Sequence, residues 1–306
     1  MTDPGSSNDD GPPDERSVAG SGVSGVGDAA GTFGPAWSAG RRRALQADLR
    51  AWLEFAHGAC DAADALALAH FRRDIAVSRK PDRTFVTAAD QLIEREIRGR
   101  IGSAFPTHGL VGEEYGEEDG EARIRWYIDP IDGTHNFMRG VPLFGTLLAV
   151  EVDGELQVGA ISAPAMRERW YAARGMGAWS RGLDGERRLH VSQVSDIADA
   201  QLLYGSGRDT VASGLMPGFD ATLSAAWRER GFGDFWGYAL VADGAAEAMF
   251  ETGMHTWDLA APQVLIEEAG GRVTDVHGER RIDAPSFIGS NGHLHEELLR
   301  RLAGGA

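Results

Sequence analysis

The sequence predicts a layered α/β fold in which sheets and helices are arranged in two halves. Up to about residue 185, two helical segments precede a run of β-prone residues with a tight-turn signal, which indicates an antiparallel sheet. Beyond that point, short apolar strands and helical segments alternate. Elements of both kinds bury their apolar faces by stacking in layers. We therefore expect one domain over residues 39–306, with sub-halves of about 39–185 and 186–306.

The composition and charge of the chain exclude several classes of protein. Of its 306 residues, 42% are hydrophobic and 25% are charged, as in ordinary soluble globular proteins. The net charge of −16 makes nucleic acid and anionic membranes poor partners. A single cysteine, Cys60, excludes an intrachain disulfide and fits a reducing compartment. No apolar run approaches the roughly 20 residues that span a bilayer, and the N-terminus lacks a signal-peptide pattern. We expect a cytoplasmic protein whose residues 1–38, rich in Gly, Ser, Asp and Pro, are disordered.

The first half begins with two amphipathic helices and continues with strands. From near Arg41, apolar residues recur at spacings of three and four, and Cys60 lies on that face as a buried, inert thiol. The second helix, 87–105, has Thr87 as its N-cap. The segments expected to form strands are 109–114, 125–129, a hairpin over 143–164 that turns at Asp153-Gly154, and 168–179.

The second half is expected to alternate between the two kinds of element. Strands are predicted at 201–206, 248–251, 271–276 and 286–291, and helices at 219–230, 234–246, 257–271 and 293–302. Gly270-Gly271 ends the third of these helices. His293 and His295 are expected to lie on an exposed terminal helix.

Acidic residues stand at the ends of several apolar elements, where the backbone positions side chains firmly. They are Asp90 early in a helix, Glu113 and Glu114 after a strand, Asp129 and Asp132 around a turn, and Asp258 at a helix start. Carboxylates that converge repel one another and are costly to desolvate. A hard cation, above all Mg²⁺, relieves that cost because it prefers oxygen ligands.

The stretch "DPIDGT" (129–134) adds an anion site to this cation site. Asp129 and Asp132 can reach metal ions from two sides of a reversal, and the carbonyl of Ile131 can point the same way. Gly133 lets a ligand approach the backbone closely, and N–H groups at a following helix start would bind an anion. Carboxylates for cations beside N–H groups for an anion predict a phosphate-ester site.

Each acid also has a purely structural interpretation when it is taken alone. Asp258 and Asp234 could each cap the helix that follows, Glu113-Glu114 could be a solvated loop, and Asp90 could lie on the surface. It is the whole set together that favours a metal site.

Four motifs resemble the inositol monophosphatase family of Mg²⁺-dependent phosphatases. They are "VTAAD" (86–90), "GEE" (112–114), "DPIDGTHNF" (129–137) and "WDLAAPQVLIEEAGG" (257–271), in the same order and spacing. The resemblance covers about residues 41–303. Within the family, "DGTHNFMRGVPLF", "ISAPAMRERWYAARGMGAW" and "GDFWGYALVADGAAE" look most like the bacterial, actinobacterial-type histidinol-phosphatase branch. The resemblance implies an α/β/α/β/α sandwich, commonly a homodimer, and two or three Mg²⁺ ions per site.

The resemblance also implies a role for each matching residue. One metal ion would be held by Glu113, Asp129 and the Ile131 carbonyl, the second by Asp129, Asp132 and Asp258, and Glu113 would reach a third through water. Backbone N–H groups of Gly133 and Thr134 would hold the phosphate. Thr134, paired with Asp90, would orient and help to deprotonate the attacking water, without a covalent intermediate. Glu251 matches a position that contacts the rest of the substrate. His135 departs from the family pattern, in which Thr or Lys is frequent.

The predicted identity of the substrate rests mostly on this resemblance, and the charge of the candidate pocket residues is compatible with it. L-Histidinol phosphate, a small phosphorylated metabolite, carries an ammonium group and an imidazole, and Asp234 and Glu251 could accept hydrogen bonds from them. Inositol 1-phosphate is the alternative substrate. Its recognition would instead need hydrogen bonds to neutral hydroxyl groups. A bisphosphate would need basic residues, and residues 229–255 offer only Arg230. A catalytically silent regulator that senses metal or a phosphorylated metabolite is a further alternative, disfavoured because every ligand position is present.

Overall fold

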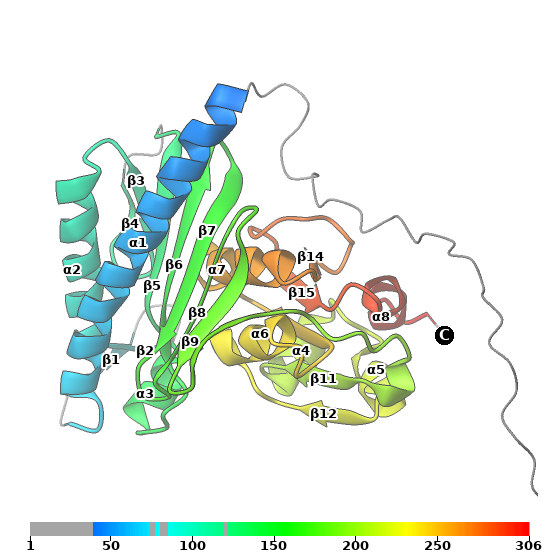
Figure 1. Cartoon of the computed structure of the whole chain (residues 1–306). Coiled ribbons are helices and arrows are strands. Elements are labelled where there is room, and N and C mark those ends of the chain that lie inside the picture. The colour runs from blue at the N-terminus through cyan, green and yellow to red at the C-terminus, as the bar shows by residue number, and fades with distance from the viewer. Residues whose placement is uncertain (1–38, 74–76, 80–84, 119–121, 306) are drawn as a thin grey trace, which may run out of the picture.

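A computed structural model describes residues 39–73, 77–79, 85–118 and 122–305 (Figure 1). The tail predicted to be disordered, residues 1–38, lies outside the described residues. Within the described ranges, helices and sheets stack in five layers, which confirms the predicted α/β/α/β/α sandwich.

The first two layers are a pair of helices and a large sheet. Helices α1 (Ala39–His70) and α2 (Ala88–Ala104) cover one face of the eight-stranded sheet. Its strands run in the order β10 (Gly185–Arg188), β9 (Gly177–Gly182), β8 (Glu168–Ala173), β7 (Glu155–Ala163), β6 (Gly145–Val152), β5 (Ile124–Asp132), β3 (Gly109–Gly112) and β4 (Gly116–Glu118). All neighbours are antiparallel except β3 and β5. A two-stranded ribbon, β1 (Val77–Arg79) with β2 (Phe85–Thr87), leads into α2, and α3 (Thr134–Met138) follows β5.

The large sheet divides two hydrophobic cores, because side chains of a strand alternate between its faces. In β5, Trp126 and Ile128 pack with Ile93 of α2 on one side, whereas Tyr127 packs on the other side. The same alternation in β6 sends Leu148 toward the α1–α2 layer. The hairpin turn was predicted correctly: Asp153 and Gly154 have φ values of 52° and 85°, which few other residue types tolerate.

The remaining layers belong to the second half of the chain. Helices α6 (Asp234–Ala242) and α7 (Thr256–Glu268) lie between the large sheet and a five-stranded sheet, and α7 contacts both. The smaller sheet runs in the order β12 (Arg228–Arg230), β11 (Gln201–Tyr204), β13 (Ala248–Thr252), β15 (Ser286–Ser290) and β14 (Arg272–Thr274). A short 3₁₀ turn (Ile197–Asp199) precedes β11, and α4 (Gly207–Ser213) follows it. Helices α5 (Phe219–Ala225) and α8 (His295–Leu302) pack over a third core.

Two predicted helices continue four or five residues beyond the observed helix ends. The prediction over 219–230 is wrong in its second half, because α5 ends at Ala225 and β12 then pairs in parallel with β11. That strand depends on a partner distant in sequence. The helix over 234–246 ends at Ala242, and Gly244 follows with a φ of 71°, which a continuing helix does not allow.

The expectation that His295 is exposed is wrong as well. Its side chain is fully buried, with Nε2 2.8 Å from Thr274 Oγ1 and Nδ1 2.7 Å from Ser290 Oγ. Both partners lie on strands of the smaller sheet, so the ring fixes the start of α8 to that sheet.

Candidate metal and phosphate site

A β-bulge brings Asp129 and Asp132 together at the end of β5. Asp129 pairs with Leu147 and Asp132 with Gly145, so three steps along β5 match two steps along β6. In a regular strand, residues three apart point to opposite faces. The extra residue of the bulge restores the parity and turns both carboxylates to the same side.

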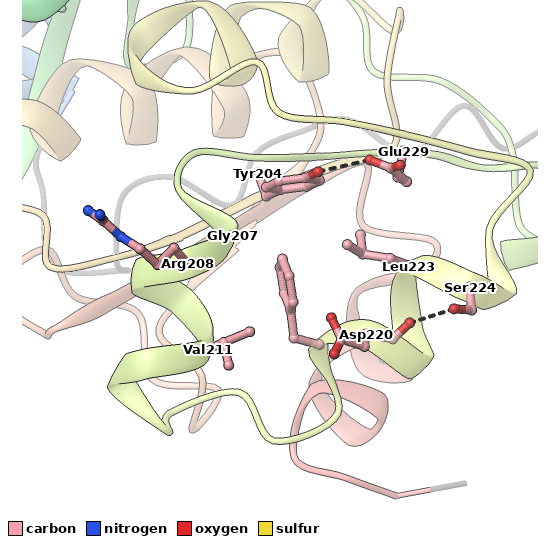
Figure 2. A pocket seen from close by; sticks show the side chains of 9 residues that line it. Tyr204, Gly207, Arg208, Val211, Asp220, Leu223, Ser224 and Glu229 are labelled. Atoms are coloured by element: carbon pink, nitrogen blue, oxygen red, sulfur yellow. Dashed lines mark hydrogen bonds between the residues drawn. The ribbon is translucent and has the colours of Figure 1, made fainter.

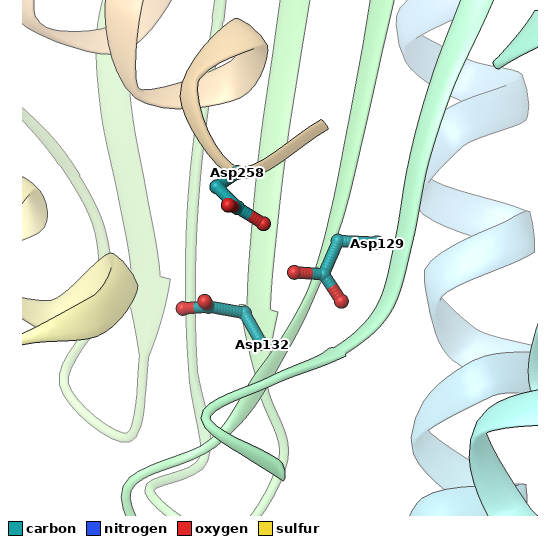
Figure 3. Close-up of side chains that lie close together, drawn as sticks. All are labelled: Asp129, Asp132 and Asp258. Atoms are coloured by element: carbon teal, nitrogen blue, oxygen red, sulfur yellow. The ribbon is translucent and has the colours of Figure 1, made fainter. Parts of the chain in front are cut away.

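Asp258 completes a cluster of three acids (Figure 3). It lies in the first turn of α7, and one oxygen from each of Asp129, Asp132 and Asp258 falls within 4.8 Å of the others. Asp258 also accepts a 2.8 Å hydrogen bond from the backbone N–H of His255. The capping role and the site role are therefore both present in one side chain.

Two further site acids are held in the same way, by backbone N–H groups at helix starts. Asp132 accepts a 2.5 Å bond from Phe235 in α6, and Asp90 accepts a 2.9 Å bond from Thr87, the predicted N-cap of α2. Asp129 differs, because its buried Oδ1 has no hydrogen-bond partner among the described residues. A buried carboxylate oxygen without a partner is costly, and a cation would satisfy it.

Burial and mutual repulsion raise the pKa of these acids. The pKa of Asp129 lies well above its ordinary value because of burial and the nearby charge of Glu113, and that of Asp132 because of burial and Asp234. Burial raises the pKa of Asp258 and that of Asp90 to about 6. Their carboxylates carry charge at a cost that a bound divalent cation removes. The donor set, all oxygen, fits such an ion.

Thr134 lies beside the acids at the start of α3. Its Oγ1 is 3.2 Å from Asp90 Oδ1 and 2.9 Å from the Ile131 carbonyl, so its single proton can be donated to either oxygen. Gly133 has a φ of 79°, and a Cβ there would lie 2.9 Å from the Leu143 carbonyl oxygen. The predicted pairing of Thr134 with Asp90 is thus present, and glycine is required at residue 133.

These residues line a pocket of about 380 Å³. Of the predicted site residues, its wall includes Glu113, Asp129, Ile131, Asp132, Gly133, Thr134, Asp234 and Asp258. Asp90 lies behind Thr134. Glu113 follows β3, where its N–H donates to the Ile128 carbonyl at 3.2 Å, and it lies on the wall outside the three-acid cluster.

The two acids predicted to contact the substrate lie at different depths. Asp234 is on the pocket wall, where its Oδ2 accepts a 3.2 Å bond from Asn136 Nδ2. Glu251 is behind it, only 5% exposed, and receives the Asp234 N–H at 3.4 Å. Burial and the charge of Asp234 raise the pKa of Glu251 to about 8.

The pocket also contains residues that the sequence reasoning did not assign. Met254, His255 and Trp257 line the wall next to Asp258, and the two rings stack with centroids 4.8 Å apart. The feature of the sequence that could have identified these three residues is their closeness to Asp258. His135 lines the wall as well, and its charge partly offsets the rise that burial causes in the pKa of Asp234.

A second hollow of about 750 Å³ lies between α4, α5 and the end of β11 (Figure 2). Its wall is formed by Tyr204, Phe219, Leu223 and neighbouring residues, and the Tyr204 hydroxyl donates to Glu229 at 3.0 Å. It shares no lining residue with the acidic pocket. Of these two pockets, only the first has a converging set of acids.

Comparison with known proteins identifies the class. The inositol monophosphatase family profile matches residues 48–304, so the chain belongs to this family and is a phosphoric monoester hydrolase. The family is generally metal-dependent, in agreement with the acid cluster.

Individual relatives extend this result. The chain is 42% identical to the histidinol-phosphatase of Mycobacterium tuberculosis over 248 residues, which are 80% of this chain and 95% of that protein. It is 34% identical to an inositol-1-monophosphatase of Mesorhizobium japonicum, covering 74% and 86%. The solved structure of an IMPase from Thermotoga maritima superimposes with a TM-score of 0.75 at 30% identity, covering 82% of this chain and 96% of that one. Among the helices of the described residues, none combines the length and the hydrophobicity that a membrane span requires.

Proposed function

We propose that this protein is a Mg²⁺-dependent phosphatase that hydrolyses L-histidinol phosphate to L-histidinol and phosphate. The observation that carries the metal assignment is the three-acid cluster with the unpartnered oxygen of Asp129. Asp129, Asp132 and Asp258 would hold one ion, and Asp129, Glu113 and the Ile131 carbonyl another. Bound Mg²⁺ would supply Lewis-acid chemistry, which reduces charge repulsion at the phosphate and lowers the pKa of water.

The protein's own proton transfer would run through Thr134. Its Oγ1 can accept a proton from the attacking water while it passes its own proton to Asp90 Oδ1, 3.2 Å away. With a pKa of about 6, Asp90 is a suitable acceptor near neutral pH. Gly133 and Thr134 line the pocket, where their N–H groups would bind the phosphate. In this scheme the buried Cys60 has no role.

The substrate assignment rests on Asp234 and on the 42% identical histidinol-phosphatase. A carboxylate on the pocket wall can pair with the ammonium group of histidinol phosphate. Glu251 lies behind Asp234 and would act on the substrate through the Asp234 backbone, from whose N–H it accepts a hydrogen bond. Inositol 1-phosphate is the second candidate, supported by the 34% identical inositol-1-monophosphatase. The complete acid set disfavours a silent regulator. The homodimer and the cytoplasmic location remain predictions.

Phosphate release tests this proposal. We expect turnover of L-histidinol phosphate in Mg²⁺, none in EDTA, and a clear preference over myo-inositol 1-phosphate. Asp234→Asn keeps an acceptor for Asn136 but removes the charge, so it should lower kcat/KM for histidinol phosphate by about tenfold or more, and less for inositol 1-phosphate. Equal losses for both substrates would contradict the role of Asp234. A preference for inositol phosphate would replace the substrate and keep the mechanism.

A further inference from the structure

A fully buried acid on α2, Glu94, holds the turn that carries Glu113. Glu94 is 0% exposed and lies one helical turn after Asp90, so both face inward. Its Oε2 accepts the backbone N–H of Glu114 at 2.7 Å, and its Oε1 accepts that of Tyr115 at 3.2 Å. The two residues that follow Glu113 are thereby fixed to the helix.

Arg98 neutralises Glu94 and binds the same turn. Its Nε donates to Glu94 Oε1 at 2.7 Å, and its other nitrogens donate to the Gly116 carbonyl and to Glu118. The turn thus gives its N–H groups to the acid and its carbonyl to the base. Because the pair is neutral overall, it adds little to the negative field at the acid cluster.

Gly112, at the end of the strand before Glu113, packs closely against the same carboxylate. A Cβ added to Gly112 would lie 2.0 Å from Glu94 Oε1 and 2.6 Å from its Cδ, although the backbone of Gly112 has an ordinary negative φ. Any larger residue would displace the Glu94 carboxylate. Contacts on both sides of Glu113 therefore converge on one buried side chain.

We propose that Glu94 is a positioning residue that sets the place of the Glu113 carboxylate relative to Asp129. This rests on the proposed role of Glu113 as a metal ligand. Two carboxylate oxygens accept three N–H donors here, which an amide cannot do, because its NH₂ group would face at least one of those donors. The turn would then shift to restore hydrogen bonding, and Glu113 would shift with it. Groups that support metal ligands in this way typically affect metal affinity by about 10–100-fold.

The experiment is calorimetric titration of the metal-free protein with Mg²⁺, together with thermal unfolding in EDTA. Glu94→Gln should raise the Kd of Mg²⁺ by about tenfold or more. Glu96→Gln is the matched control, since Glu96 forms the same kind of pair with Arg100 (2.7 Å) on the exposed face of the same helix. It should leave the Kd unchanged. Gly112→Ala reaches the same contact from the strand and should weaken Mg²⁺ binding as Glu94→Gln does, and it decides the matter if Glu94→Gln does not fold.

A lowered Tm with an unchanged Kd would show that Glu94 only stabilises the fold, and would overturn the inference. A wild-type protein that binds no Mg²⁺ would overturn both the inference and the proposed metal site. A wild-type protein that binds Mg²⁺ but does not hydrolyse histidinol phosphate would refute the substrate alone, and the shift in Kd would still support the positioning role.

Discussion

Asp129→Asn should stabilise the metal-free protein while it abolishes its response to Mg²⁺. Oxygens of Asp129, Asp132 and Asp258 lie within 4.8 Å of one another. At that separation, with an effective dielectric constant of about 20, two charged carboxylates repel by about 3 kcal/mol. Protonation limits this cost, since the folded-state pKa of Asp129 is raised. We therefore expect the variant to gain about 1–3 kcal/mol in EDTA at pH 8, and its Tm to rise by about 2–4 °C per kcal/mol.

The sign of the pH dependence follows from the direction of the shift. Because the pKa of Asp129 is higher in the folded state than in the unfolded state, wild-type stability is lost as pH rises through the folded value. The stability that Asp129→Asn gains over the wild type in EDTA should therefore grow with pH and vanish in acid.

Thermal unfolding in EDTA and in Mg²⁺ measures both effects. Mg²⁺ should raise the Tm of the wild type but not that of Asp129→Asn, because only the native wild type binds the ion. Phosphate release should fall by orders of magnitude in the variant. The exposed Asp184→Asn is the control and should change stability by no more than about 0.5 kcal/mol. A variant that is less stable than the wild type in EDTA, or that keeps the Mg²⁺ shift, would refute the reasoning.

Three further predictions concern other residues. Thr134→Val should lower kcat by about 100-fold or more at saturating Mg²⁺ with an unchanged Kd of Mg²⁺ in calorimetry, and normal turnover would exclude the proton route. Burial lowers the pKa of His295 from 6.5 to about 4. The stability that its neutral ring contributes to the folded protein is therefore lost as pH falls between these values. Urea unfolding over this pH range should show that the wild type loses about 3 kcal/mol of its free energy of unfolding, a loss that His295→Gln lacks. The same dependence of the free energy of unfolding on pH in both proteins would contradict this prediction. Burial raises the pKa of Cys60 to about 12, so a thiol reagent should label it only in denaturant, and rapid labelling of the native protein would disprove its burial.

Local chemistry allowed much of the fold to be predicted. The Asp153-Gly154 hairpin follows from two residues that tolerate positive φ, and the amphipathic face of α1 from its apolar spacing. The segment 228–230 shows the limit of this approach, because its strand exists only through pairing with β11, far away in sequence. His295 was misplaced because its burial depends on tertiary packing: its ring contacts Thr274, 21 residues earlier, as well as Ser290, five residues earlier.

The site was predictable in its chemistry and less so in its geometry. Their place at the ends of apolar elements and the resemblance of the motifs identified Asp129, Asp132 and Asp258 as candidate ligands. The shared direction of the first two depends on a bulge that becomes visible only in the register with β6. Glu94 gave no signal, because an acid four residues after Asp90 looks like the polar face of a helix. Its burial arises when the turn after β3 packs on α2.

The hydrogen bonds that hold the site acids give the protein three intrinsic spectroscopic probes. The N–H groups of Thr87, Phe235 and His255, from the starts of three different helices, each donate to a carboxylate of the site. Amide proton shifts and exchange rates respond to the charge on the acceptor. The three amides should therefore change together when a cation binds or when the acids take up protons, whereas an amide in the second hollow, such as that of Ser224, should not. Nuclear magnetic resonance could therefore follow the ionisation of Asp90, Asp132 and Asp258 separately, through one backbone amide for each acid.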